Sequence, residues 1–251
     1  MNAQIDTQWY SRFFDGLIVD MQRCMYPPEL TRLEADFLQR QFGLPPGSLI
    51  ADLPCGDGRL AIALAKAGYG VQGLDISPDI LETARQNAIA AKVAVEFREG
   101  DMQFLPWAGE LDGAFCFGNS FAYFDETGNR GFLGEVYRAL KPGGRFVLQT
   151  NLLAESIFAR QPARSWYEFG DVLFMHAPAY DPVSGVLSSD YTLMRGGERE
   201  VKRAHYRVYR LREVADMLLA SGFAGLRCFG GMNGEPFKLG DVSAYLVVDK
   251  P

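Results

Sequence analysis

Two hydrophobic patterns alternate along most of the chain, and together they predict an α/β fold. Short apolar runs of the length of buried strands occur at 49–51, 69–74, 93–98, 111–117, 145–150, 222–229 and 243–249. Apolar residues at helical spacing separate most of these runs, at 60–67, 78–91, 129–140 and 211–221. Such apolar runs are typical of parallel strands that helices cover on both faces. The alternation therefore predicts a doubly wound α/β sheet.

The section 151–210 breaks this alternation. Extended segments at 166–177, 185–194 and 198–210 follow one another without a helical pattern between them. Turn signals, Asp181-Pro182 and Gly196-Gly197, separate the successive segments. Because consecutive strands joined by turns form antiparallel sheets, we expect a three-stranded antiparallel β insertion after the fifth strand.

The residues before the first strand carry a different pattern. Apolar side chains recur at helical spacing at Trp9, Phe13, Leu17 and Met21, and a second helix is expected after Pro27-Pro28. The first helix either packs on the domain as an ordinary amphipathic helix or forms a lid over a ligand cleft. We therefore divide the chain into N-terminal lid helices (1–47), a core (48–150 and 211–251) and an insertion that caps the substrate (151–210).

A loop with two glycines, Gly56 and Gly58, follows the first strand, and an acid stands at the end of each of the first two strands. Glycine allows a sharp turn and close approach of a ligand to the backbone. The second acid, Asp75, lies 19 residues after Gly56 (75 − 56), which is the spacing of dinucleotide-binding units. However, Asp52 and Asp57 place negative charge where a pyrophosphate would bind, so the loop suits a cationic ligand better.

The run Asp52-Leu53-Pro54-Cys55-Gly56-Asp57-Gly58-Arg59 resembles the first motif of class I S-adenosylmethionine-dependent methyltransferases that act on small molecules. It departs from many relatives at Pro54, where a small residue is common. Gly118-Asn119-Ser120-Phe121 is similar to a stretch of glycine N-methyltransferases and related enzymes, and Leu140 to Gly144 is similar to the family's Leu-Lys-Pro-Gly-Gly turn. The resemblance implies a seven-stranded Rossmann-like sheet whose last strand is antiparallel, with S-adenosylmethionine as cofactor.

The resemblance also implies a role for individual residues. The glycine loop would hold the methionine part of the cofactor, Asp75 would accept both ribose hydroxyls, and Asp101 with Met102 would bind the adenine. The expected cofactor-binding residues are Asp52, Pro54, Cys55, Gly56, Gly58, Asp75, Ile76, Asp101, Met102, Phe117 and Asn119. Cys55 is expected to serve packing in the motif and not covalent catalysis.

The acceptor pocket is expected between the N-terminal helix and the insertion. Its predicted lining is Tyr10, Asn119, Tyr123 and His176, of which Tyr123 and His176 are the candidate catalytic residues. Further candidate bases are His205 and Tyr209, although an amine acceptor needs no dedicated base. Aromatic lining suits a partly apolar acceptor, and Arg164, Arg207 and Arg210 leave room for an acidic group on it.

Composition narrows these expectations. Hydrophobic residues make up 48% of the 251 residues, which supports a sizeable core. The net charge of −6 disfavours a nucleic-acid partner, which requires a basic face. Four cysteines without a C-x-x-C pair and two histidines predict no metal site. No leader and no apolar stretch of about 18 residues stands out, so a cytoplasmic protein without a membrane partner is expected.

The function expected from the sequence is S-adenosylmethionine-dependent methyl transfer to an N, O or C nucleophile of a small molecule. A homodimer is considered as the assembly. Two other functions stay open at this point, an NAD(P)-dependent oxidoreductase and a non-catalytic S-adenosylmethionine-binding protein. The oxidoreductase requires neither Asp52, nor Asp101 with Met102, nor the turn at 141–144.

Overall fold

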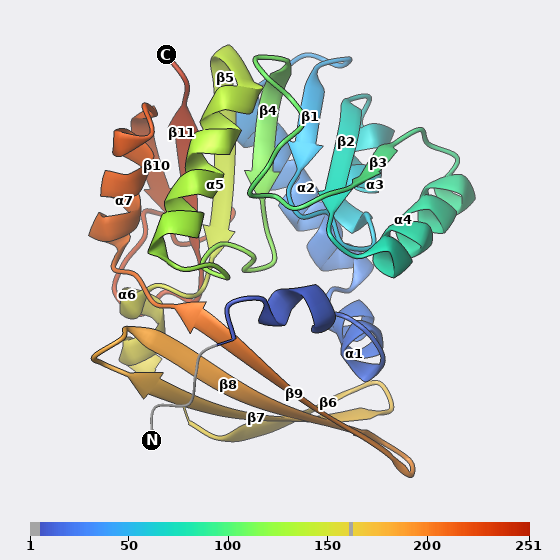
Figure 1. The fold of residues 1–251 in the computed structure, drawn as a ribbon. Coiled ribbons are helices and arrows are strands. Elements are labelled where there is room, and N and C mark those ends of the chain that lie inside the picture. The colour runs from blue at the N-terminus through green and yellow to red at the C-terminus, as the bar shows by residue number, and fades with distance from the viewer. Residues whose placement is uncertain (1–5, 161–162) are drawn as a thin grey trace.

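The computed structural model describes residues 6–160 and 163–251. Its main sheet has seven strands in the order β10-β11-β5-β4-β1-β2-β3, shown in Figure 1. The strands are β1 (Leu49–Asp52), β2 (Gly70–Asp75), β3 (Glu96–Glu99), β4 (Leu111–Cys116), β5 (Leu140–Thr150), β10 (Ala224–Phe229) and β11 (Ala244–Asp249). β11 is antiparallel to both of its neighbours, and the pairs among β1 to β5 are parallel. The predicted seven-stranded α/β fold is confirmed.

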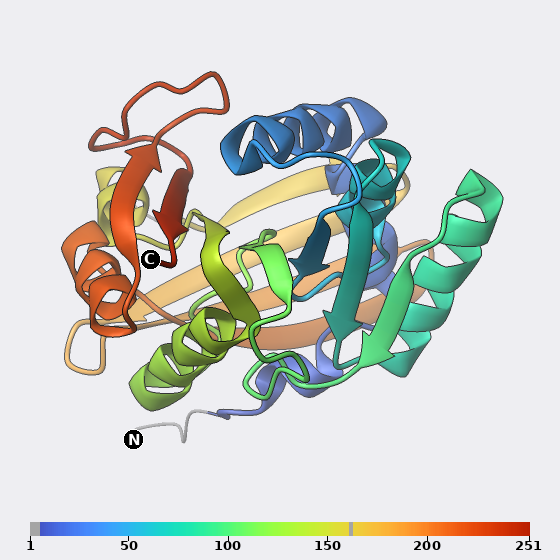
Figure 2. The same ribbon diagram turned by 90° about the horizontal axis from the view of Figure 1, so that it is seen from above.

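Helices cover both faces of this sheet, as Figure 2 shows from above. They are α2 (Pro28–Phe42), α3 (Arg59–Lys66) and α4 (Pro78–Ala91) on one face, and α5 (Glu126–Ala139) and α7 (Leu211–Ala220) on the other. Successive strand residues enter different cores because side chains alternate across a sheet, so Ile50 packs with the first group and Ala51 with the second. No helix in the described parts of the chain is both long and apolar enough to cross a membrane.

The third strand is shorter than its hydrophobic pattern predicts. Lys92 adopts a left-handed conformation (φ 57°) at the end of α4, and the Val93 N–H donates to the Ala88 carbonyl at 3.2 Å. Val93 therefore completes the end of the helix, and pairing with β2 begins only at Glu96.

The insertion is a four-stranded antiparallel sheet, not the three-stranded sheet that we expected. It follows α6 (Ala154–Ile157) and η2 (Phe158–Arg160), and its strands are β6 (Ser165–Phe169), β7 (Val172–Asp181), β8 (Val186–Arg195) and β9 (Glu198–Arg207). The expected segment 166–177 is wrong as one strand because the chain turns at Gly170 (φ 62°) and returns as β7. Figure 1 shows this sheet beyond the carboxyl ends of β1, β4 and β5.

The N-terminal segment lies between the two sheets, and it is not one helix. A 3₁₀ turn η1 (Trp9–Arg12) and helix α1 (Leu17–Met25) are separated at Gly16, whose φ of 61° interrupts the helical path. Trp9, Phe13 and Leu17 are nevertheless buried in the same core cluster as residues of the main sheet. The apolar spacing thus predicted the buried face and missed the break. The domain boundaries at 47, 150 and 210 stay predictions.

Residues of β9 bind the start of α1. The Leu17 N–H donates to both carboxylate oxygens of Glu200 at 3.1 Å, and Lys202 forms an ion pair with Asp15. The first turn of a helix has free N–H groups and a positive dipole end, so a carboxylate there is stabilising. No side chain of the helix's own N-cap supplies this bond. The insertion therefore caps α1 from 183 residues away.

We predict that Gly16→Ala destabilises the protein by about 2–4 kcal/mol. The backbone conformation at Gly16 is strained for alanine, and its Cβ would collide with the Glu200 carboxylate and displace it from the Leu17 N–H. Gly131→Ala is the matched control, because a Cβ in α5 meets nothing within 4 Å. That variant should gain about 0.5–1 kcal/mol. Equal unfolding free energies for the two variants in urea titrations would contradict the role of Gly16.

Candidate cofactor and acceptor site

The carboxylate of Asp75 organises the glycine loop. Its Oδ2 accepts the Gly56 N–H at 2.9 Å, and its Oδ1 accepts the Ser77 N–H at 3.0 Å. The Cys55 N–H donates to the Leu74 carbonyl at 2.9 Å, so the loop after β1 is tied to the end of β2. Each carboxylate oxygen retains acceptor capacity for a ligand hydroxyl.

Close packing under the loop explains Cys55 and Gly73. A Cβ at Gly73 would lie 2.8 Å from Cys55 Sγ, so only glycine on β2 admits the buried thiol. Burial raises the pKa of Cys55 well above its ordinary value, and the negative charges of Asp52 and Asp75 raise it further. The group is therefore a neutral thiol at physiological pH, which agrees with packing and not with a nucleophile.

A cavity of about 430 Å³ lies beside the loop. Its floor is formed by the strand ends and the loop, including Asp52, Pro54, Cys55, Gly56, Asp75 and Phe117. Its other walls come from the N-terminal segment and the loop after β4, including Phe14, Val19, Gln22, Tyr26, Ser120 and Tyr123. Ligands of open parallel sheets bind at this position, outside the carboxyl ends of the strands.

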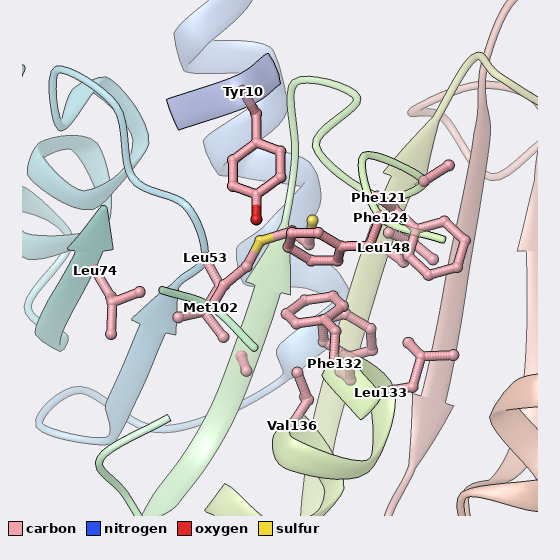
Figure 3. Packing of buried hydrophobic residues seen from close by; sticks show 14 of the residues in the cluster. Tyr10, Leu53, Leu74, Met102, Phe121, Phe124, Phe132, Leu133, Val136 and Leu148 are labelled. Carbon is pink, nitrogen blue, oxygen red and sulfur yellow. The ribbon is translucent and has the colours of Figure 1, made fainter. Parts of the chain in front are cut away.

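A second cavity of about 40 Å³ adjoins the first. The two share Phe14, Pro54, Asp75 and Tyr123 in their walls. The smaller one is otherwise lined by Tyr10, Leu74, Ile76, Gly100, Asp101, Met102 and Phe124. Figure 3 shows Tyr10 reaching from the N-terminal segment toward Met102, with Leu53 and Leu74 beside them. A mostly apolar slot bordered by the carboxylates of Asp75 and Asp101 suits a flat heterocycle with an amino group.

The electrostatics of the larger cavity are set by buried carboxylates. Burial raises the pKa of Asp52 well above its ordinary value, and the charges of Asp75 and Asp57 raise it further, while Arg59 opposes the shift. Burial also raises the pKa of Asp75, against the backbone N–H groups of Ser77, Gly56 and Ile76. A buried, incompletely compensated acidic pair attracts a cation and repels a pyrophosphate.

Arg59 and Tyr26 form part of the cavity wall that the sequence did not single out. The Arg59 guanidinium pairs with the buried carboxylate of Glu34 and lies 4.2 Å from the centre of the Tyr26 ring. Such a pair fixes a planar cation at the rim of the cavity. The only signal in the sequence was the arginine that ends the motif at 52–59, because Glu34 reaches it from α2 and Tyr26 from the end of α1.

Most of the predicted cofactor residues lie together. Six of them line the larger cavity, Ile76, Asp101 and Met102 line the smaller one, and Pro54 and Asp75 line both. Gly58 stands at the N-cap of α3 with φ 80°. Asn119 lines neither cavity; its Oδ1 accepts the Asn151 N–H at 2.6 Å and so holds the turn after β4.

The residues predicted to bind the acceptor do not all line the same cavity. Tyr123 lines both cavities, whereas Tyr10 lines only the smaller one. His176 lies on the face of the insertion that packs on the N-terminal segment, stacked between Phe174 and Tyr191, with its Nε2 3.0 Å from Ser189 Oγ. It lines neither cavity. The roles of Tyr10 and His176 in acceptor binding stay predictions.

The other candidate bases also lie outside the cavity walls. His205 contacts Ser188 Oγ at 2.9 Å, and Tyr209 accepts a hydrogen bond from Asn129 at 3.1 Å. Burial raises the pKa of Tyr123 far above its ordinary value, so this phenol stays protonated at neutral pH. Tyr123 can therefore donate a hydrogen bond or present its ring face, and its candidate role is positioning.

Comparison with known proteins agrees with this geometry. Residues 50–144 match a family model described as a methyltransferase domain. The matched residues are less than half of the 251-residue chain, so the match identifies a methyltransferase domain in this part of it. The match spans β1 to the turn within β5 and so contains the glycine loop, Asp75, Asp101 and the loop after β4.

Curated relatives match part of this chain over part of their own length. A demethylmenaquinone methyltransferase of Thermus thermophilus is 39% identical over 107 residues, which are 39% of this chain and 45% of the relative. A glycine/sarcosine N-methyltransferase of Parasynechococcus marenigrum is 33% identical over 118 residues, 46% of this chain and 42% of the relative. The chain thus spans less than half the length of these relatives.

Solved structures share the fold over most of the chain. The CcbJ methyltransferase of Streptomyces caelestis has a TM-score of 0.77 at 20% identity and covers 90% of this chain and 96% of its own. CalS10 of Micromonospora echinaspora is described as an amino pentose methyltransferase and was solved with S-adenosylmethionine bound. It has a TM-score of 0.71 at 15% identity and covers 96% of this chain and 99% of its own. At these identities the likeness shows the fold alone.

We predict that Asp52→Asn stabilises the ligand-free protein and weakens binding of S-adenosylhomocysteine, by about 1.5–3 kcal/mol if a hydrogen bond to a charged group is lost. Because folding raises the pKa of Asp52 above 3.8, this carboxyl contributes stability below pH 3.8 that is lost as the pH rises through its folded pKa. The melting temperature of the variant should exceed that of the wild type by a margin that grows as the pH rises from 3.8 through the folded pKa of Asp52. A margin independent of pH would show that Asp52 is not an uncompensated buried acid.

Proposed function

We propose that the chain transfers the methyl group of S-adenosylmethionine to a small-molecule acceptor through an N, O or C nucleophile. The observation that carries this proposal is the buried acidic pair Asp52 and Asp75 on adjacent parallel strand ends, beside a cavity of about 430 Å³. The family to which the domain belongs supports the same cofactor.

The donor groups of the site fit each part of S-adenosylmethionine. Asp75 has spare acceptor capacity for ribose hydroxyls, and Asp101 with Met102 borders the apolar slot suited to adenine. Asp52 suits the cationic amino group, and Arg59 at the rim suits the carboxylate of the methionine part. The remaining wall of the larger cavity, which includes Phe14, would then face the sulfonium.

The cofactor supplies an electrophilic methyl carbon when bound. With the cofactor bound, the acceptor would take up this methyl group through its lone pair, S-adenosylhomocysteine would remain, and the acceptor's proton would pass to solvent. The protein's residues hold the nucleophile in line and exclude water. Aromatic faces of Phe14, Tyr26 and Tyr123 in the wall favour a nearby cation. Positioning is therefore the main catalytic contribution that we assign to these residues.

The proposal also includes the class of the acceptor and the cellular compartment of the protein. The net charge of −6 and the size of the cavity, about 430 Å³, favour a small acceptor over a nucleic acid. All four cysteines are free, which agrees with a reducing, cytoplasmic compartment. The homodimer expected from the sequence stays a prediction here. The spacing of Gly56 and Asp75 is shared with dinucleotide-binding units, but the acids Asp52 and Asp57 disfavour the oxidoreductase.

We predict that S-adenosylhomocysteine raises the melting temperature of the protein and that NADPH does not. Ligand at ~100 times its dissociation constant adds about 2.7 kcal/mol to the unfolding free energy. A thermal shift with NADPH but none with S-adenosylhomocysteine would overturn the assignment. Binding without transfer of a labelled methyl group to any compound of an acceptor panel would favour a non-catalytic S-adenosylmethionine-binding protein.

We predict that Asp75→Asn weakens S-adenosylhomocysteine binding far more than Asp57→Asn. Each lost hydrogen bond to a charged acceptor costs roughly 1.5–3 kcal/mol. Both residues line the larger cavity, but the Asp57 Oδ1 only accepts the Arg59 N–H at 3.3 Å, whereas Asp75 also lines the smaller cavity. Calorimetric titration measures the two constants, and ligand-free melting curves control for the loss of the loop contacts of Asp75. Equal dissociation constants would place the ribose elsewhere.

A further inference from the structure

The sheet of β6 to β9 has two different faces because side chains alternate along each strand. One face packs on the N-terminal segment through Tyr191, Glu200 and Tyr206. The opposite face, which we call the outer face, carries the residues between these. One of its rows crosses all four strands in register, as Trp166, Met175, Thr192 and Val201.

This outer face is apolar at its centre and open. Trp166 is 65% exposed and Val201 is 56% exposed, on the two edge strands of the row. Figure 1 shows no helix or strand of the described residues beyond this face of the sheet. Exposed aromatic and β-branched side chains that form a continuous row are typical of an interaction surface, unlike single exposed apolar residues.

The next row of the outer face carries opposite charges at its two ends. It consists of Glu168, Leu173, Met194 and Arg199 in register. Glu168 lies on the β6 edge and Arg199 on the β9 edge, and both are exposed. The two edges are about 14 Å apart, three strand spacings, so the charges do not neutralise each other within one copy.

We propose that the outer face docks on the same face of a second copy of this chain, with a two-fold axis that lies in the interface and runs along the strands. A rotation of 180° about this axis places each row opposite the same row of the second copy, with the order of the four strands reversed. Glu168 then faces Arg199 of the second copy, Leu173 faces its Met194, and Trp166 faces its Val201. The apolar rows become the centre of the contact, and two symmetric ion pairs flank them.

The positions of the charged residues favour this axis over the other two-fold axis in the plane of the interface. An in-plane axis perpendicular to the strands would place β9 against β9, and Arg199 and Arg203 of one copy would approach the same residues of the other. Packed sheets lie about 10 Å apart, a gap that a glutamate and an arginine side chain bridge together. Arg203 is paired with Asp190 at 2.8 Å within its own chain, so these two residues of the neighbouring row add no net charge to the contact. The arrangement does not depend on which acceptor the enzyme uses.

Sedimentation velocity of the full chain over a range of concentrations tests this interface. We expect a wild-type dimer, and we expect Glu168→Arg and Arg199→Glu each to raise the dimer dissociation constant at least ~tenfold, because each places like charges opposite each other. The double variant Glu168→Arg/Arg199→Glu should restore the wild-type constant. Both residues are exposed, so melting temperatures should stay close to that of the wild type.

Charged substitutions at exposed apolar residues distinguish this face from other surfaces as the interface. Val201→Lys should also dissociate the dimer, whereas Ile89→Glu, at a 76% exposed position on α4, should not. A wild-type monomer at all concentrations would overturn the proposal. A dimer that Val201→Lys leaves intact would place the interface elsewhere, and a double variant no better than the single ones would exclude the proposed axis.

Discussion

The hydrogen bonds from Gly56 and Ser77 to the Asp75 carboxylate are the interaction on which the rest of the site depends. They join the loop after the first strand to the end of the second, so both strands present their acids to one cavity. A carboxylate that accepts backbone N–H groups is oriented by them, and its free lone pairs point where the backbone leaves space. The close packing of Cys55 against Gly73 lies at the same junction.

The buried acids at this junction lower the stability of the ligand-free protein. Asp52 is 3% exposed and Asp75 is 7% exposed, and the pKa of each is raised by its burial. Burying carboxylates with incomplete compensation lowers stability, and a cationic ligand recovers the loss when it binds. Arg59 does not supply the full compensation because it is already paired with Glu34. The site thus trades stability of the free protein for affinity.

The walls of the cavity depend on a contact between distant parts of the chain. Glu200 of the insertion holds the first turn of α1, and α1 contributes Val19, Gln22 and Arg23 to the cavity. The ion pair between Arg195 and Asp20, at 2.7 Å, adds a second link between the same elements. The insertion therefore shapes the cavity mainly through the N-terminal segment, and its own residue His176 lies behind that segment.

The sequence determined the core of the fold and the cofactor loop, because local patterns specify both. Alternating runs predicted the seven strands, and the spacing of Asp52, Gly56 and Asp75 predicted that these residues meet at one edge of the sheet. Turn chemistry was harder to interpret. Gly16 and Gly170 break a helix and a strand, yet neither changes the apolar period that predicted those elements.

Only the tertiary structure decided which side chains meet across the chain. The pairing of Arg59 with Glu34, the capping of α1 by Glu200 and the position of His176 away from the cavity arise from packing between segments far apart in sequence. Strand pairing also fixed the outer face of the insertion, because register decides which residues form a row. Periodicity in the sequence specifies which face of an element is buried, but not which other element buries it.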